Sequence, residues 1–246
     1  MTHQVRNHLT LSKRQLIDCT SRGSILQTGG TVVSDSFTVT AVANSVDVEL
    51  PSIETFVLAE SGEITPTGSN RELNAAWLPV VGEMAATVTA WLSEIGVVLG
   101  GDGYITASIT RADEVNGEAH FDDDMYTPNE GVGVAAVAAD RTGPRICNGV
   151  LKTITESPRH LLSADEFRPA FEAGELEHDS FDAHTLVAFP QFGQLHAGPG
   201  PCGGPDDVRH LLVFRASTTP TTDARQYGDT RWPRTRADTV KPCETA

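Results

Sequence analysis

The feature that most constrains the fold is a series of short apolar segments between residues 104 and 218. Many of them alternate apolar and polar residues or are rich in β-branched residues, and Gly or Pro lies between them. Short strands separated by turn residues at close spacing are typical of a β-barrel or β-sandwich. The expected strands cover residues 104–112, 131–139, 144–152, 184–192, 193–198 and 209–218.

Helical patterns flank this strand-rich region. The expected helices cover residues 11–22, 79–95 and 163–174. In the longest of them, apolar residues recur at helical spacing, Pro79 suits the first turn, and Gly96 suits the stop. In the last, Ser163 and Glu166 have the spacing of a capping box. The sequence thus predicts a mainly β protein with flanking helices.

The segments outside these strands and helices agree with a single domain. Residues 31–43 are rich in β-branched residues and predict one or two strands, whereas residues 50–70 carry Pro, Ser, Gly and Thr and predict a loop. We expect a single domain over residues 1–218, with its core at about 100–218. Residues 219–246 contain few apolar side chains and predict a loosely ordered extension.

Composition narrows the classes of function. The formal net charge of −15 argues against a broad electrostatic grip on nucleic acid. No apolar run is long enough to predict a membrane span, and the N-terminus lacks the apolar core of a secretory signal, so a cytoplasmic protein is expected. The cysteines form no C-x-x-C pair and predict isolated thiols; they are Cys19, Cys147, Cys202 and Cys243.

The stretch "GEAHFDDDMY" contains a candidate metal site. His120 and Asp122 lie two residues apart, so on a strand or at its exit they point to the same side and can bind one cation together. Asp123 or Asp124 would be the carboxylate ligand if the register were shifted. The alternative is a solvated acidic turn in which His120 is an incidental neighbour.

His196 is the best candidate for a third ligand. It lies in "FGQLHAGPGP", at the end of an expected strand and just before a Gly/Pro-rich turn. With His120 and Asp122 it makes a set of two histidines and one carboxylate, which leaves three coordination positions open and is typical of non-haem Fe(II). The alternative is a core histidine bonded to a backbone carbonyl.

The strand "RHLLVFRAS" that follows places Arg209, Arg215 and Ser217 on one face. An arginine on the apolar face of a strand is costly unless it meets an anion, so two on one face predict either a bound dicarboxylate or two separate acidic partners. For Arg209, a salt bridge to Asp206 or Asp207 is the competing interpretation. Hydroxyl side chains on the strand 104–112 could add hydrogen bonds to a bound carboxylate, but an ordinary Thr-rich strand is the preferred interpretation; they are Thr106, Ser108 and Thr110.

The ordered set of H-x-D, a distal histidine and strand arginines resembles the Fe(II)/2-oxoglutarate-dependent dioxygenases. The R-x5-R strand is similar to that of the AlkB-type alkylation-repair branch, where the first arginine binds the distal carboxylate of 2-oxoglutarate and the second lies near its metal-chelating end. Carried over, Arg209 and Arg215 take these roles. Ser217 also fits an R-x-S pattern of other branches, in which Arg215 would bind the distal carboxylate with help from Ser217. Both assignments stay open.

The resemblance implies a double-stranded β-helix, a jelly-roll or cupin-like barrel, with Fe(II) and 2-oxoglutarate as cofactors. It implies an oxygenase that uses O2 to hydroxylate or otherwise oxidise a small polar metabolite, such as an amino-acid derivative. The acidic charge and the lack of an evident nucleotide-recognition lid disfavour a nucleic-acid substrate, although they do not exclude a local basic groove. Two alternatives remain: a cupin-like metal enzyme that does not use 2-oxoglutarate, and a barrel that acts only as a binding module.

Overall fold

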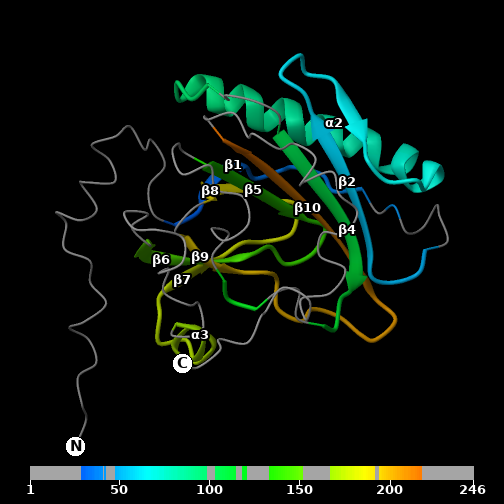
Figure 1. Ribbon diagram of the computed structural model, residues 1–246. Coiled ribbons are helices and arrows are strands. Elements are labelled where there is room, and N and C mark those ends of the chain that lie inside the picture. The colour runs from blue at the N-terminus through cyan, green and yellow to red at the C-terminus, as the bar shows by residue number, and fades with distance from the viewer. Residues whose placement is uncertain are drawn as a thin grey trace, which may run out of the picture.

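The computed structural model consists of four layers, with helix α2 on a large sheet, a small sheet beneath it, and helix α3 below (Figure 1). It describes residues 29–40, 42, 48–98, 103–114, 118–120, 133–151, 167–191 and 194–217. The helices are α2 (Arg71–Glu94) and α3 (Arg168–Glu172). The strands are β1 (Thr31–Ser34), β2 (Ser52–Leu58), β3 (Ile64–Pro66), β4 (Gly103–Arg111), β5 (Gly133–Ala139), β6 (Arg145–Leu151), β7 (His178–Ser180), β8 (Leu186–Pro190), β9 (Gln194–Ala197) and β10 (Val208–Ser217).

The strand order identifies the barrel as a double-stranded β-helix. The large sheet has the order β1-β8-β5-β10-β4-β2-β3, and the small sheet has the order β7-β6-β9. His120 adds a bridge to His196 on β9. From β4 onward the chain passes between the sheets repeatedly, and every strand pair is antiparallel. This path is that of a jelly roll, so the predicted fold class is confirmed.

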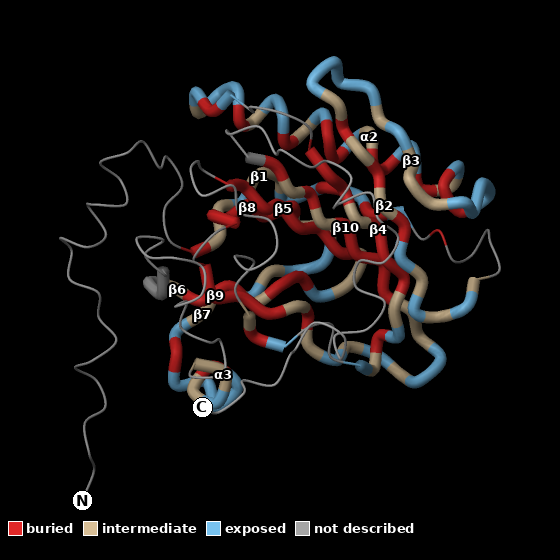
Figure 2. Tube along the Cα trace, viewed as in Figure 1, coloured by how far each residue is buried: buried red, intermediate tan, exposed pale blue. Residues whose placement is uncertain are grey.

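The large sheet has two differently used faces. On β10, Leu212 and Phe214 point toward α2 and join the main hydrophobic core. Leu211 and Val213 point the other way and pack with Val137 and other side chains of the inner face. Period-2 alternation puts Arg209 and Arg215 on this inner face as well. Figure 2 shows how much of β4, β5 and β10 is buried between the layers.

Helix α2 covers the outer face of the large sheet. Its apolar stripe, which includes Trp77, Val81 and Val88, is fully buried. By length and composition α2 could cross a membrane, and within the described part of the chain no other helix could. Its burial against the sheet accounts for that composition.

The predicted start of this helix was wrong. Helix α2 begins at Arg71, and Pro79 lies inside it. The Asn70 side chain caps the true N-terminus by accepting from the Leu73 N–H at 3.1 Å. Burial of the stripe on both sides of Pro79 outweighs the loss of one backbone hydrogen bond at the proline.

Two further expectations need correction. Residues 50–70 form the hairpin β2–β3 rather than a loop, because alternate side chains of β2, such as Phe56, are buried against α2. In the described part of 163–174 the helix covers only Arg168–Glu172, and a short strand, β7, follows it. The predicted helix 11–22 and the extension 219–246 lie outside the described residues.

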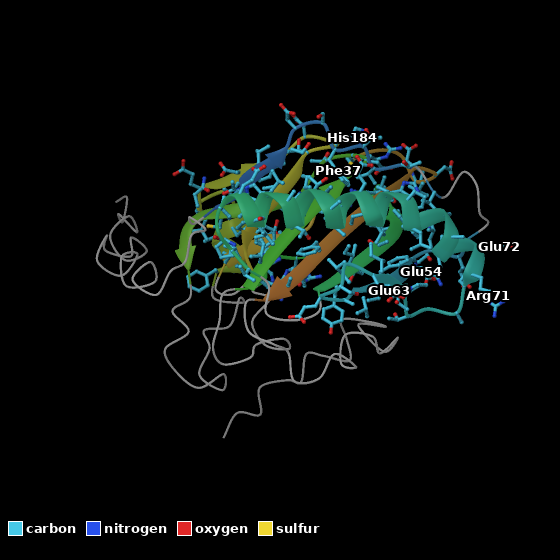
Figure 3. All side chains as sticks on the ribbon, turned by 90° about the horizontal axis from the view of Figure 1, so that it is seen from above. Phe37, Glu54, Glu63, Arg71, Glu72 and His184 are labelled. Atoms are coloured by element: carbon cyan, nitrogen blue, oxygen red, sulfur yellow. The ribbon has the colours of Figure 1, made fainter. Side chains whose placement is uncertain are left out.

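Glu54 provides a test of the helix–sheet packing. Its side chain is 8% exposed, and burial raises the pKa of its carboxyl group. The Gly68 backbone lies so close that a side chain there would collide with the carboxylate. Figure 3 labels Glu54 and the exposed Glu63, which serves as a control.

We expect Glu54→Gln to raise the free energy of unfolding by about 1 kcal/mol at pH 7. Because the folded-state pKa is raised, the unfolded chain releases this proton first. Below the pKa of the unfolded state, Glu54 is neutral in both states and its burial costs no charge. As the pH rises through the folded-state pKa, the buried carboxyl group must ionise, and this part of the free energy of unfolding is lost. Urea unfolding from pH 4 to pH 8 should therefore show a gain that grows with pH. A gain that does not vary with pH, or an equal gain in Glu63→Gln, would contradict this explanation.

Candidate active site

The structure brings two of the predicted metal ligands together. The His120 N–H donates to the His196 carbonyl at 2.8 Å, and the His196 N–H donates to the His120 carbonyl at 3.1 Å. The two residues thus form a direct antiparallel bridge. Their imidazole rings lie on the same side, with centroids 4.3 Å apart and planes inclined by 53°. Two imidazoles separated by 76 positions in sequence therefore lie side by side.

Each imidazole is oriented by a backbone carbonyl two residues before it. His120 Nδ1 lies 2.8 Å from the Glu118 carbonyl, and His196 Nδ1 lies 3.0 Å from the Gln194 carbonyl. A carbonyl only accepts, so Nδ1 carries a hydrogen, and in the neutral form of each ring the lone pair is then on Nε2. This is the usual orientation of a metal-binding histidine. The predicted alternative of a core histidine bonded to a carbonyl describes the Nδ1 side of His196, and it leaves the role of Nε2 unaffected.

The histidine pair faces the space between the two sheets. Ile146 lies opposite His196 in the register of β6 and β9, and it packs with Leu211 and other inner-face side chains of the large sheet. The ring of Phe189 on β8 contacts the His196 ring at a centroid distance of 4.7 Å. The other face of the small sheet packs against α3, where Leu195 and Phe171 belong to a separate cluster.

The third predicted ligand, Asp122, lies outside the described residues, as do Asp123 and Asp124. Within the described ranges, His, Cys, Asp and Glu form no group of three or more that could hold a metal ion. The donor set nevertheless fits a metal in one respect: two imidazoles, each with Nδ1 held by a backbone carbonyl, lie next to one another. A carboxylate from the segment after His120 would complete the set.

Arg209 lies on the inner face, fully buried, and is held by the backbone. Its Nη2 donates to the carbonyls of Gly200 at 2.7 Å and Ala112 at 3.1 Å, and it lies 3.1 Å from the Cys202 sulfur. The predicted alternative, a salt bridge to Asp206 or Asp207, is not found among the described residues. Asp207 pairs with Arg141 at 3.2 Å instead.

Two buried polar atoms near Arg209 have no hydrogen-bond partner within the described structure: Arg209 Nε and Thr110 Oγ1. The two residues are directly opposite in the register of β10 and β4. Leaving a buried donor unsatisfied typically costs about 1–3 kcal/mol, and a native structure usually offers a reason for it. A carboxylate bound here would accept from the guanidinium and from the hydroxyl.

Arg215 is related to the histidines through the strand register. In register, Arg215 is opposite Ala135 on β5, and Ala135 is opposite Phe189 on β8, whose ring contacts His196. On the other side Arg215 is opposite Tyr104, whose side chain is buried. Ser217 ends β10 opposite Gly133, and its side chain is not among those described.

Two residues close to the site were not singled out as site residues from the sequence. Tyr104 is on the same strand face as Thr106, so the alternation of 104–112 could have identified it. Cys202 lies in the Gly/Pro-rich turn after His196, and no sequence pattern predicts its contact with Arg209. That contact depends on how the turn folds back over β10.

No protein-family model matches the chain, and no curated protein matches it. Among solved structures, EvdO2 from Micromonospora carbonacea var. aurantiaca is 12% identical with a TM-score of 0.41, over 59% of this chain. The matched part spans 65% of EvdO2, less than two thirds of its length.

Two others cover more of the chain. HygX from Streptomyces hygroscopicus, solved with nickel and 2-oxoglutarate, is 14% identical with a TM-score of 0.42, over 84% of this chain and 87% of its own. The Kdo hydroxylase KdoO, described as a non-heme Fe(II) alphaketoglutarate dependent dioxygenase, is 12% identical with a TM-score of 0.44, over 76% of this chain and 73% of its own.

Proposed function

We propose that this protein is an Fe(II)- and 2-oxoglutarate-dependent oxygenase that oxidises a small polar metabolite. The observation that carries the proposal is the bridge between His120 and His196, with both Nε2 atoms oriented by carbonyls at Nδ1. In this proposal His120, His196 and the carboxylate of Asp122 hold the metal. When bound, Fe(II) with 2-oxoglutarate and O2 supplies the oxidising power for hydroxylation of a C–H bond, with succinate and carbon dioxide as co-products.

For the cosubstrate, we propose that Arg209 and Thr110 bind the distal carboxylate of 2-oxoglutarate. The two atoms without partners, Arg209 Nε and Thr110 Oγ1, support this assignment. Arg215 takes a position near the metal-chelating end, which its register with Ala135, itself opposite Phe189, supports. Of the two assignments left open by the sequence, these observations favour the AlkB-type one over the R-x-S one.

The protein residues would contribute orientation and exclusion of water. Leu211, Val137 and Ile146 make the inner faces apolar between the arginines and the histidines. An apolar setting strengthens the attraction between a guanidinium and a carboxylate, because little water competes for either. For the substrate we propose a neutral or cationic metabolite, which suits an acidic protein with a net charge of −15.

The test is an anaerobic titration of the full-length apoprotein with Fe(II) and then with 2-oxoglutarate. Bidentate chelation should give a weak visible metal-to-ligand charge-transfer band that saturates with 2-oxoglutarate and is absent with succinate. Iron binding without this band would reject the use of 2-oxoglutarate and favour a cupin-like metal enzyme. Absence of iron binding would reject the metal site and leave a binding module.

A further inference from the structure

We propose that Cys202 is an oxidation site that controls cosubstrate binding, because a sulfenic acid formed there disturbs the guanidinium of Arg209. The proposal rests on the proposed function, since it assigns Arg209 to the cosubstrate. It adds a regulatory modification site to the turn between β9 and β10. The oxidant class is a hydroperoxide, with hydrogen peroxide as the probe.

The contact between the two side chains is direct. Cys202 Sγ lies 3.1 Å from Arg209 Nη2, and the Cys202 N–H donates to the Ala112 carbonyl at 2.7 Å. The same carbonyl accepts from Arg209 Nη2 at 3.1 Å, so one acceptor fixes both the turn and the guanidinium. Cys202 is therefore not an isolated thiol, because its backbone and its sulfur are both tied to the arginine site.

Accessibility differs sharply between the two partners. Arg209 is 0% exposed, whereas Cys202 is partly exposed. Cys202 is therefore the one of the two residues that a peroxide in solution can approach. The other cysteine in the described ranges, Cys147, is buried in the cluster between the small sheet and α3, and it serves as the unreactive reference thiol.

The surroundings of Cys202 also activate it. Burial alone would raise the pKa of the Cys202 thiol, but hydrogen bonds from Arg209 and Thr142 and the positive charge of Arg209 outweigh it and lower the pKa. The thiolate is the nucleophilic form of cysteine, and a guanidinium is a recognised cause of its stabilisation.

The chemical step is a two-electron oxidation of sulfur. The thiolate attacks one oxygen of hydrogen peroxide, the S–O bond forms, and the O–O bond breaks. Hydroxide leaves with the electron pair of that bond and takes a proton to become water. The product is a sulfenic acid, which thiol reductants reverse.

This product changes the arginine site. Sulfur and Nη2 are only 3.1 Å apart, so a sulfenic oxygen on the side that faces Arg209 cannot be accommodated without breaking this contact. Arg209 Nε already lacks a partner within the described structure, and its place opposite Thr110 depends on the contacts at Nη2. A displaced guanidinium no longer presents Nε to a carboxylate, so the affinity for 2-oxoglutarate falls.

The experiment has two independent readouts on the full-length protein. The first is peroxide oxidation at each cysteine, measured by dimedone labelling and peptide mass spectrometry. We expect Cys202 to label at least about tenfold faster than Cys147, and Arg209→Lys to slow labelling of Cys202. Arg141→Lys is the matched control, because Arg141 lies near the same turn but is paired with Asp207. Equal labelling of Cys202 and Cys147, or equal rates in the two lysine variants, would overturn the proposal.

The second readout is 2-oxoglutarate affinity before peroxide, after peroxide, and after reduction with dithiothreitol. We expect a loss of at least about tenfold after peroxide, recovery on reduction, and no loss in Cys202→Ser. If the untreated protein does not bind 2-oxoglutarate, the proposed function fails. The labelling readout then still decides whether Cys202 is the oxidation site. If it binds equally well before and after oxidation of Cys202, this inference fails and the proposed function survives.

Discussion

Replacing His196 with alanine is expected to abolish tight metal binding and the charge-transfer band with 2-oxoglutarate. His196 is one of two imidazoles at the bridge, and its Nε2 has no substitute among the described side chains nearby. Changes to the residues that merely orient metal ligands cost about 10–100-fold in affinity, so loss of a ligand should cost at least 100-fold. Fe(II) affinity from anaerobic equilibrium dialysis measures the effect directly.

His178 offers a matched control for that substitution. Its Nδ1 also lies near the carbonyl two residues before it, that of Leu176 at 3.2 Å, and its ring stacks on Phe171 at 4.9 Å. It faces the cluster between the small sheet and α3 rather than the space between the two sheets. His178→Ala should therefore bind Fe(II) as the unmodified protein does. Comparable metal loss in both variants would show that the effect arises from damage to the small sheet.

Replacing Arg209 with lysine is expected to weaken 2-oxoglutarate binding about 100-fold while Fe(II) affinity changes little. Lysine keeps the charge but lacks Nε–H and the planar fork that binds a carboxylate with two parallel hydrogen bonds. Truncation of one partner in a buried, hydrogen-bonded charge pair costs about 2–5 kcal/mol. Titration of the charge-transfer band with 2-oxoglutarate gives the affinity.

Because Arg209 is fully buried, its replacement will also lower stability, and the two effects must be separated. Circular dichroism at the titration temperature should show a folded protein, and Fe(II) affinity provides a second measure of an intact site. The control is Arg141→Lys, which should leave 2-oxoglutarate affinity within about twofold because its ion pair with Asp207 is partly exposed. Unchanged 2-oxoglutarate affinity in Arg209→Lys would move the carboxylate site to Arg215.

The strands were predictable because their pattern is local. Alternation and Gly/Pro turns located β4, β5, β8, β9 and β10 to within a few residues. The hairpin β2–β3 was missed because Pro51, Pro66 and the polar residues between the strands resemble a loop, while its stability comes from burial of Phe56 and its neighbours under α2. The start of α2 was missed for a similar reason, since the proline rule is local and the burial that overrides it is tertiary.

The candidate site divides in the same way. The sequence could propose His120 and His196 as partners because each has a recognisable local setting, and strand periodicity could place Arg209 and Arg215 on one face. It could not predict the different surroundings of the two arginines. The carbonyls of Ala112 and Gly200 and the sulfur of Cys202 reach Arg209 only through the path of two turns, and turn paths are poorly encoded in residue pattern.

The small side chains of β5 have a consequence for what the barrel can hold. Its inward positions include Ala135 and Ala139, and Ala135 separates Phe189 from Arg215 across the sheet. The Ala135 side chain is a single methyl group and projects little from the sheet. At this position, one alanine therefore limits how much side chain fills the space between the two sheets. A barrel with phenylalanine at the same position could keep both histidines and still have no room for a second molecule beside them. The space for a second molecule and the affinity for a metal thus depend on different strands and can change independently.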